Sequence, residues 1–173
     1  MIQLKVNSIV PQGGLPSGSN GGIIQVKSTI KTNTFSTNST STTFTAVTGL
    51  SVAITPSTNN NKILIIANVN LGTRGDSQAM LKLKRGSTDI CVGDADGIRI
   101  RCACEGHTGG TNHGLDNHVI QFLDSPGDTN EQTYQVFMRV TGNTHYINRT
   151  NPDDNETYQS RVPSTITAYE VSV

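Results

Sequence analysis

The sequence has no tryptophan and few charged residues, and the low charge narrows the partners it can bind. Only 15% of its 173 residues are charged, and the formal net charge is zero at pH 7. Proteins that bind nucleic acid usually carry a basic patch or a high isoelectric point. We therefore expect no nucleic-acid partner.

Long apolar segments are also missing. The first ten residues, MIQLKVNSIV, lack the apolar core of a signal peptide, and no run approaches the roughly 20 residues that cross a membrane. The three cysteines are an odd number, which in a chain without an export signal predicts free thiols in a reducing compartment. We expect a protein made in a cytoplasm, without membrane insertion.

Motifs for catalysis and for cofactor binding are absent as well. No Gly-x-Ser-x-Gly turn marks a nucleophilic serine. The acidic stretches 94–97 and 151–156 have hard oxygen donors, but neither matches a calcium-binding EF-hand loop. We predict a protein that is not an enzyme, with no catalytic residues and no cofactor, and keep a glycan-cleaving enzyme as a remote alternative.

One stretch has the residue types of a metal site. Cys102 and Cys104 are two residues apart, and His107 follows them. Thiolate and imidazole are zinc ligands, but a structural zinc ion takes four ligands at spacings that this stretch does not match. We predict buried free thiols and no metal site, with these three residues as weak metal candidates.

The chain does contain a series of short strands. Between residues 43 and 55, apolar residues at positions 44, 46, 50, 52 and 54 alternate with threonine and serine, which is typical of a half-buried strand. Pro56 ends this strand because it cannot donate a hydrogen bond to a sheet. The aliphatic run 63–66 then predicts a central strand, over 62–71, that is buried on both faces.

Further strands are predicted at short intervals, separated by turn-forming residues, over 79–85, 89–92, 98–104, 118–123, 133–140, 145–148 and 164–173. No segment favours a helix. About ten short strands joined by polar turns predict an all-β fold, an antiparallel β-sandwich of jelly-roll type.

The N-terminal segment differs from the rest. Residues 11–22 are rich in glycine and proline, which break regular structure. The preceding residues carry apolar side chains that need a surface to bury them: Ile2, Leu4, Val6, Ile9 and Val10. We predict an extended anchoring arm over 1–22 that docks on a partner, followed by a β-sandwich domain over 23–173.

Two polar loops are candidates for ligand contact. The first is glycine-rich and holds His107, His113 and Asp116. The second follows Pro152 and contains Asp153, Asp154 and Tyr158, whose ring could stack on a sugar. Long polar loops at the rim of a sandwich usually form contact surfaces, so we expect binding there and no chemistry.

Several blocks resemble virion structural proteins of tailed bacteriophages, especially those of marine podoviruses and siphoviruses such as cyanophages. They cover 6–26, 31–65, 83–97, 122–140, 146–149 and 163–171, and include the phrases VNSIVPQGGLPSGSNGGIIQV and FLDSPGDTNEQTYQVFMRV. The resemblance implies a trimeric, non-enzymatic β-sandwich displayed on the particle. The three cysteines and the histidine-containing loop depart from the usual pattern.

The sequence therefore favours a virion protein made in the host bacterial cytoplasm, a homotrimer that serves as a capsid decoration or a short tail fibre. Its partners would be other virion proteins of the capsid or tail, bound through the arm. The alternative is a receptor-binding, lectin-like fibre tip whose loops 105–118 and 151–158 contact host glycans. In the trimer, each sandwich would pack an apolar outer face on its neighbours.

Overall fold

The structure, a computed structural model, describes residues 22–72, 74–107 and 114–173. Within these ranges the chain forms eleven β-strands in two antiparallel sheets. None of the described residues forms a helix with the length and apolar character needed to span a membrane.

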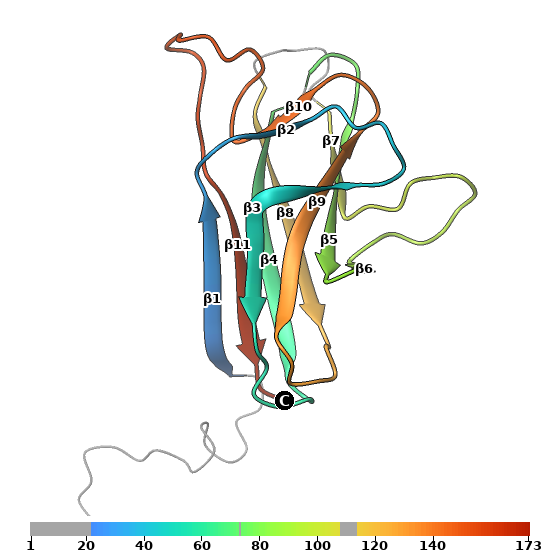
Figure 1. The fold of residues 1–173 in the computed structure, drawn as a ribbon, viewed down its shortest axis with the longest axis vertical. Coiled ribbons are helices and arrows are strands. Elements are labelled where there is room, and N and C mark those ends of the chain that lie inside the picture. The colour runs from blue at the N-terminus through green and yellow to red at the C-terminus, as the bar shows by residue number, and fades with distance from the viewer. Residues whose placement is uncertain (1–21, 73, 108–113) are drawn as a thin grey trace, which may run out of the picture.

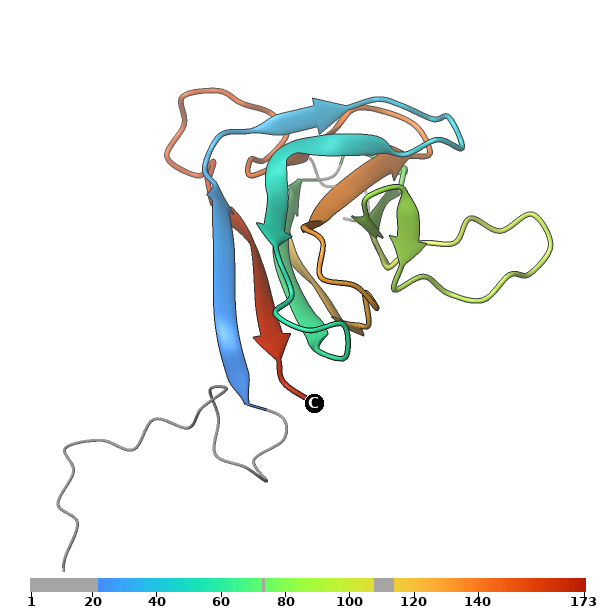
Figure 2. The same cartoon turned by 60° about the horizontal axis from the view of Figure 1, so that its bottom comes forward.

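The two sheets are sheet A and sheet B. Sheet A contains β1 (Ile23–Lys31), β2 (Phe35–Thr37), β4 (Lys62–Gly72), β8 (Asp116–Asp124), β10 (His145–Ile147) and β11 (Ser164–Val171). Sheet B contains β3 (Thr45–Ile54), β5 (Ala79–Arg85), β6 (Thr88–Ile90), β7 (Cys104–Gly106) and β9 (Gln132–Val140). Sheet B lies nearer the viewer in Figure 1, and Figure 2 shows the two layers from another side.

The strand order is that of a jelly roll. The long strands of sheet A stand in the order β1-β11-β4-β8, and those of sheet B in the order β3-β9-β5. Strands β6 and β7 pair with successive halves of the remaining edge of β5 and together replace one strand. Eight strands thus alternate between two sheets as in a double Greek key. The predicted fold class is confirmed.

The core lies between the sheets and follows the alternation of the strands. Ile63, Ile65 and Leu71 of β4 are fully buried, as are Leu81 and Leu83 of β5 on the opposite sheet. Each such side chain contributes about 1.5–3 kcal/mol by leaving water. The aliphatic layer is thin but continuous.

One polar group joins this core. The hydroxyl of Tyr134 donates to Asp124 Oδ2 at 2.7 Å, and Arg85 Nη1 donates to the same oxygen at 2.7 Å. Tyr134 is fully buried and Asp124 nearly so. A buried hydroxyl or carboxylate needs such partners to offset its lost hydration.

Three local predictions were wrong. The first concerns β4, which is buried on one face only, since Leu64 and Ile66 alternate with buried neighbours and stay half-exposed. An aliphatic run does not distinguish a strand covered on both faces from one whose outer face is also apolar.

The second error is in β3, where Gly49 adopts φ of +80° and the pairing with β9 shifts register between Ala46 and Ser51. This conformation is easy for glycine. Val47 is therefore buried in place of Ala46. The third error is the strand over 98–104, of which only Cys104 is in β7, because residues 91–103 form a loop.

The two ends of the sandwich differ. Strand β1 begins and β11 ends at the same end, where Ser172 N donates to Gly22 O at 2.9 Å. The short strands β2 and β10 and the loop over 149–163, here called the rim loop, lie at the opposite end (Figure 1). The loop over 91–103, here called the side loop, projects from the flank of the sandwich in both views.

Candidate functional site

The rim loop is held at its base by Asn148, which follows β10. Asn148 is fully buried, and its amide group donates to Lys31 O at 2.7 Å and to Asn33 O at 3.0 Å. Its side-chain oxygen accepts a hydrogen bond of 2.6 Å from Ser164 Oγ at the start of β11. Both ends of the rim loop are thus fixed to sheet A, which gives its side chains a rigid support.

A second constraint comes from Gly72 at the end of β4. A Cβ atom there would lie 2.0 Å from the carbonyl oxygen of Arg149, a distance that no side chain permits. Only glycine allows the first residue of the rim loop to approach β4 so closely. Gly72 and Arg149 are far apart in the printed sequence, so their close approach can be seen only in the folded chain.

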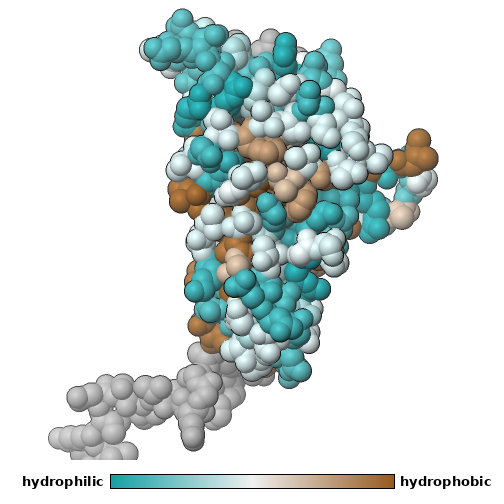
Figure 3. Space-filling model, viewed as in Figure 1, coloured by the Kyte–Doolittle hydropathy of each residue, from teal (hydrophilic) through white to brown (hydrophobic). Residues whose placement is uncertain are grey.

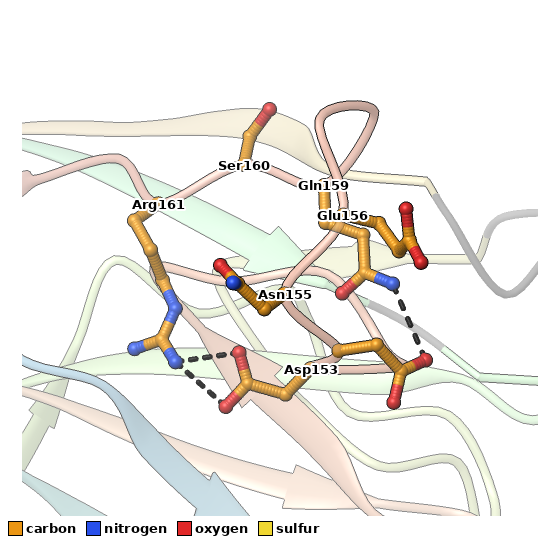
Figure 4. A pocket seen from close by; sticks show the side chains of 7 residues that line it. Asp153, Asn155, Glu156, Gln159, Ser160 and Arg161 are labelled. Atoms are coloured by element: carbon orange, nitrogen blue, oxygen red, sulfur yellow. Dashed lines mark hydrogen bonds and ion pairs between the residues drawn. The ribbon is translucent and has the colours of Figure 1, made fainter.

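The rim loop encloses a polar hollow of about 270 Å³, lined by Asp153, Asp154, Asn155, Glu156, Gln159, Ser160 and Arg161. Figure 4 shows the guanidinium of Arg161 facing the carboxylate of Asp153, with Nη2 at 2.5 Å and 2.6 Å from the two oxygens. Arg149 Nη1 lies 3.4 Å from the same carboxylate. Asp153 is therefore neutralised by two cations, and the hollow offers mainly hydrogen-bonding groups.

Three of the predicted contact residues belong to this loop. Asp153 and Asp154 line the hollow, and Tyr158 lies on the same loop with 64% of its surface exposed. Sugar hydroxyls are bound by such carboxylates and amides, and an exposed aromatic ring can cover the apolar face of a sugar. The arrangement suits reversible binding of a polar ligand.

The other predicted contact loop is only partly visible. His107 and Asp116 are exposed, whereas His113 lies outside the described residues. His118, on β8, is half-buried, and its Nε2 atom has no hydrogen-bond partner among the described groups. Burial lowers the pKa of His118, although the nearby charge of Asp116 opposes this. Burial therefore favours the neutral form of this imidazole on β8.

The three cysteines are free and half-buried. Cys91 and Cys104 pack against the hydrophobic core. Burial, and to a smaller extent the neighbouring thiols Cys102 and Cys91, raise the pKa of Cys104 to about 12. Burial also raises the pKa of Cys91 and Cys102, which favours the protonated thiol, a poorer nucleophile than the thiolate.

The metal candidates do not form a cluster in the described part of the chain. Within those residues, no group of three or more His, Cys, Asp or Glu side chains is arranged to hold a metal ion. Cys102 precedes β7, Cys104 begins it and His107 follows it. The carboxylates of the rim loop likewise form no such group.

Sequence reasoning missed one buried polar pair. His145 of β10 is fully buried, and its Nε2 atom lies 2.7 Å from Ser77 Oγ. Ser77 Oγ donates to Arg74 O at 3.1 Å, so the imidazole Nε2–H donates to Ser77 and leaves Nδ1 as an acceptor without a partner. Burial, and the charge of His107, lower the pKa of His145 to about 4. Both groups are covered, so the pair supports the fold.

Comparisons with known proteins find matches among solved structures but not among family models or curated proteins. No protein-family model matches the sequence, and no curated protein matches it. Among solved structures, the chain matches a structure of the infectious bursal disease virus Gt strain, with 12% identity and a TM-score of 0.44 over 98% of this chain and 43% of the other.

It also matches T=1 particles derived from infectious bursal virus, with 11% identity and a TM-score of 0.46 over 98% of this chain and 41% of the other. The chain thus spans about two fifths of the length of the viral chains that it matches. Scores this low describe a distant likeness in outline, and we base no functional argument on them.

Proposed function

We propose that this protein is a non-enzymatic structural protein of a virus particle, of the tailed-bacteriophage type that its sequence resembles. It is displayed as a homotrimeric capsid decoration or short fibre and is attached through the arm over 1–22. Jelly rolls of this kind build viral capsid proteins and lectins, although a fold alone does not decide a function.

The observation that carries the proposal is that the N-terminal segment and the rim loop lie at opposite ends of the sandwich. The chain enters β1 at one end, and the polar rim loop lies at the other (Figure 1). Between the two ends, the sheets form a rigid body with a fully packed core. A protein bound through its N-terminal segment would therefore hold the rim loop away from the surface to which it is attached.

The experiment is a reconstitution of attachment. Purified protein is added to particles that lack it, and the bound fraction is measured after sedimentation. Deleting residues 1–22 should abolish binding while the circular dichroism spectrum stays that of a β-protein. Attachment of the truncated protein at the wild-type level would refute the anchoring role.

A matched pair of arm variants sharpens this test. Leu4→Asp with Val6→Asp places charges on the predicted apolar positions of the arm. Gln3→Asp with Asn7→Asp adds the same charge at the alternating polar positions. The first pair should lose attachment and the second should retain it, because only the first alters the side chains that need burial.

The rim loop favours a second candidate function, the recognition of a host-surface glycan. The supporting observation is the polar hollow beside the exposed Tyr158. Glycan-array binding should be lost in Tyr158→Ala and kept in Tyr158→Phe, since phenylalanine preserves the stacking ring. Equal binding by wild type and Tyr158→Ala would exclude Tyr158 from the recognition site.

A further inference from the structure

The first strand of the sandwich is inverted in the sense that its apolar side chains point outward. In β1, Val26 and Ile30 point away from the core and are 53% and 61% exposed, whereas Lys31 at the end of the strand is buried. The pairing with β11 determines this arrangement, because Thr29 stands opposite the buried Ile166. Residues opposite each other in an antiparallel pair share one face of the sheet. The apolar side of β1 is therefore left without a partner inside its own chain.

The inverted strand continues an apolar outer face across sheet A. One row of opposed residues runs the full width of the sheet, from Val26 through Tyr169 and Leu64 to Leu123. The outer face comprises residues 23, 26, 28 and 30 of β1, the odd residues 165–171 of β11, the even residues 62–70 of β4 and the odd residues 117–123 of β8. Its single charged residue is Lys62, at one corner.

The outward face of sheet B has the opposite character. Lys82 and Lys84 both pair with Asp89 there, with nitrogen–oxygen distances of 2.5 Å and 3.1 Å. The same two ammonium groups lie over the rings of Phe44 and Phe137. Figure 3, which shows this side, has mostly white and teal residues, with brown residues along the margin where β1 lies and in a patch near the centre. The outer face of sheet B thus carries paired charged side chains, whereas the outer face of sheet A carries almost none.

The size of the outer face decides between the segments that could cover it. A face four strands wide and about eight residues long measures roughly 19 Å by 26 Å, or about 500 Å². A single extended segment such as the arm would cover one strand width of it. Three copies that cover this area in a ring bury about 1,500 Å² in total, because each copy shares its face between two neighbours.

Exposure is greatest at the two margins of the outer face. Strands β1 and β8 are the outer two of the four long strands of sheet A. On β8, Val119 and Leu123 are 54% and 47% exposed, much like Val26 on β1, whereas Leu64 in the middle is half-buried. In a closed ring, the β1 margin of one copy would meet the β8 margin of the next. Interfaces in general have cores depleted of charge and enriched in tyrosine, as this face is.

We propose that copies of this chain associate through the outer face of sheet A, with the β1 margin of one copy against the β8 margin of its neighbour in a three-fold ring. The inference rests on the proposed function for the trimer and adds the surface that forms it. The occupant is a second copy of this chain.

Light scattering coupled to size-exclusion chromatography tests it on the full-length protein. Wild type should have three times the monomer mass of 18.5 kDa. Val26→Lys combined with Leu123→Lys should shift the protein to the monomer, because both margins then carry like charges. Ala53→Lys, an exposed apolar position on sheet B, is the matched control and should stay trimeric. Circular dichroism verifies that each variant is folded.

The possible outcomes separate the two proposals. A wild-type monomer at all concentrations, or a trimer that survives both lysine substitutions, would overturn the inference. Dissociation by the arm deletion alone would overturn it too, because the arm would then be the contact. A dimer that the two lysines dissociate would uphold the outer face as the contact and refute the three-fold ring. None of these results depends on attachment to particles, which the sedimentation experiment measures separately.

Discussion

Burial of His145 predicts a specific loss of stability in mild acid. The imidazole is fully covered, and its pKa falls from an ordinary value of 6.5 to about 4 in the folded protein. Because the folded-state pKa is the lower one, the unfolded chain takes up the proton first as the pH falls. The stabilisation is complete above pH 6.5 and is lost progressively between pH 6.5 and 4.

The size of the loss follows from the difference between the two pKa values. Each pKa unit corresponds to about 1.4 kcal/mol, so His145 accounts for about 3 kcal/mol of the acid sensitivity. His145→Gln provides the comparison, since glutamine can still donate to Ser77 Oγ but does not titrate. Wild type should lose about 3 kcal/mol more than the variant on going from pH 7 to pH 4.

Urea unfolding at a series of pH values measures this difference. The four tyrosines give a fluorescence signal that no tryptophan obscures, and circular dichroism provides an independent probe. The free energy of unfolding in water is extrapolated at each pH for both proteins. Parallel curves for wild type and His145→Gln would show that the imidazole titrates normally, and the argument from burial would fail.

Three further predictions concern the body of the sandwich. Burial raises the pKa of Glu170, but hydrogen bonds from Asn61 and Ser57 outweigh this and lower it, so Glu170→Gln should cost about 1–3 kcal/mol at neutral pH and progressively less as the pH falls below about 4.5. Urea unfolding at neutral pH and below pH 4.5 measures the cost of the substitution, and an equal cost under the two conditions would contradict the prediction. Gly72→Ala should lower the melting temperature through its clash with a carbonyl oxygen of the rim loop, costing about 1–3 kcal/mol, and an unchanged melting curve would count against the contact. The thiol of Cys104 should react with iodoacetamide at pH 8 far more slowly in the native protein than in urea, and equal rates would show that it is not protected.

Much of the fold was predictable because alternation and turns are local. The strand predicted over 79–85 coincides with β5, and the strand predicted over 133–140 lies within β9. Alternating apolar and polar residues indicate that a strand has two unlike faces, but they do not determine which face packs against the core. In β1 the pairing with β11 determines which face is inside, and Val26 points outward.

The candidate sites were less predictable, because they depend on distant contacts. Tyr158 and its acidic neighbours were recognisable as a polar loop, but the hollow they line requires the folded base around Asn148. His145 and Ser77 are 68 positions apart, and neither lies in a motif. The strand predicted over 98–104 had suitable residues, yet only its last position pairs with β5 as part of β7.

The side loop has a practical consequence. Its base is closed by hydrogen bonds from Gly93 N to Cys102 O and from Ala103 N to Leu81 O, and Ile98 within it is fully exposed. Residues 94–101, inside the first of these closures, contribute no side chain to the described hydrophobic core. A foreign peptide spliced at this point would be carried on the flank of every copy, away from the rim loop. The protein thus offers a ready insertion site for antigen display or for an affinity tag.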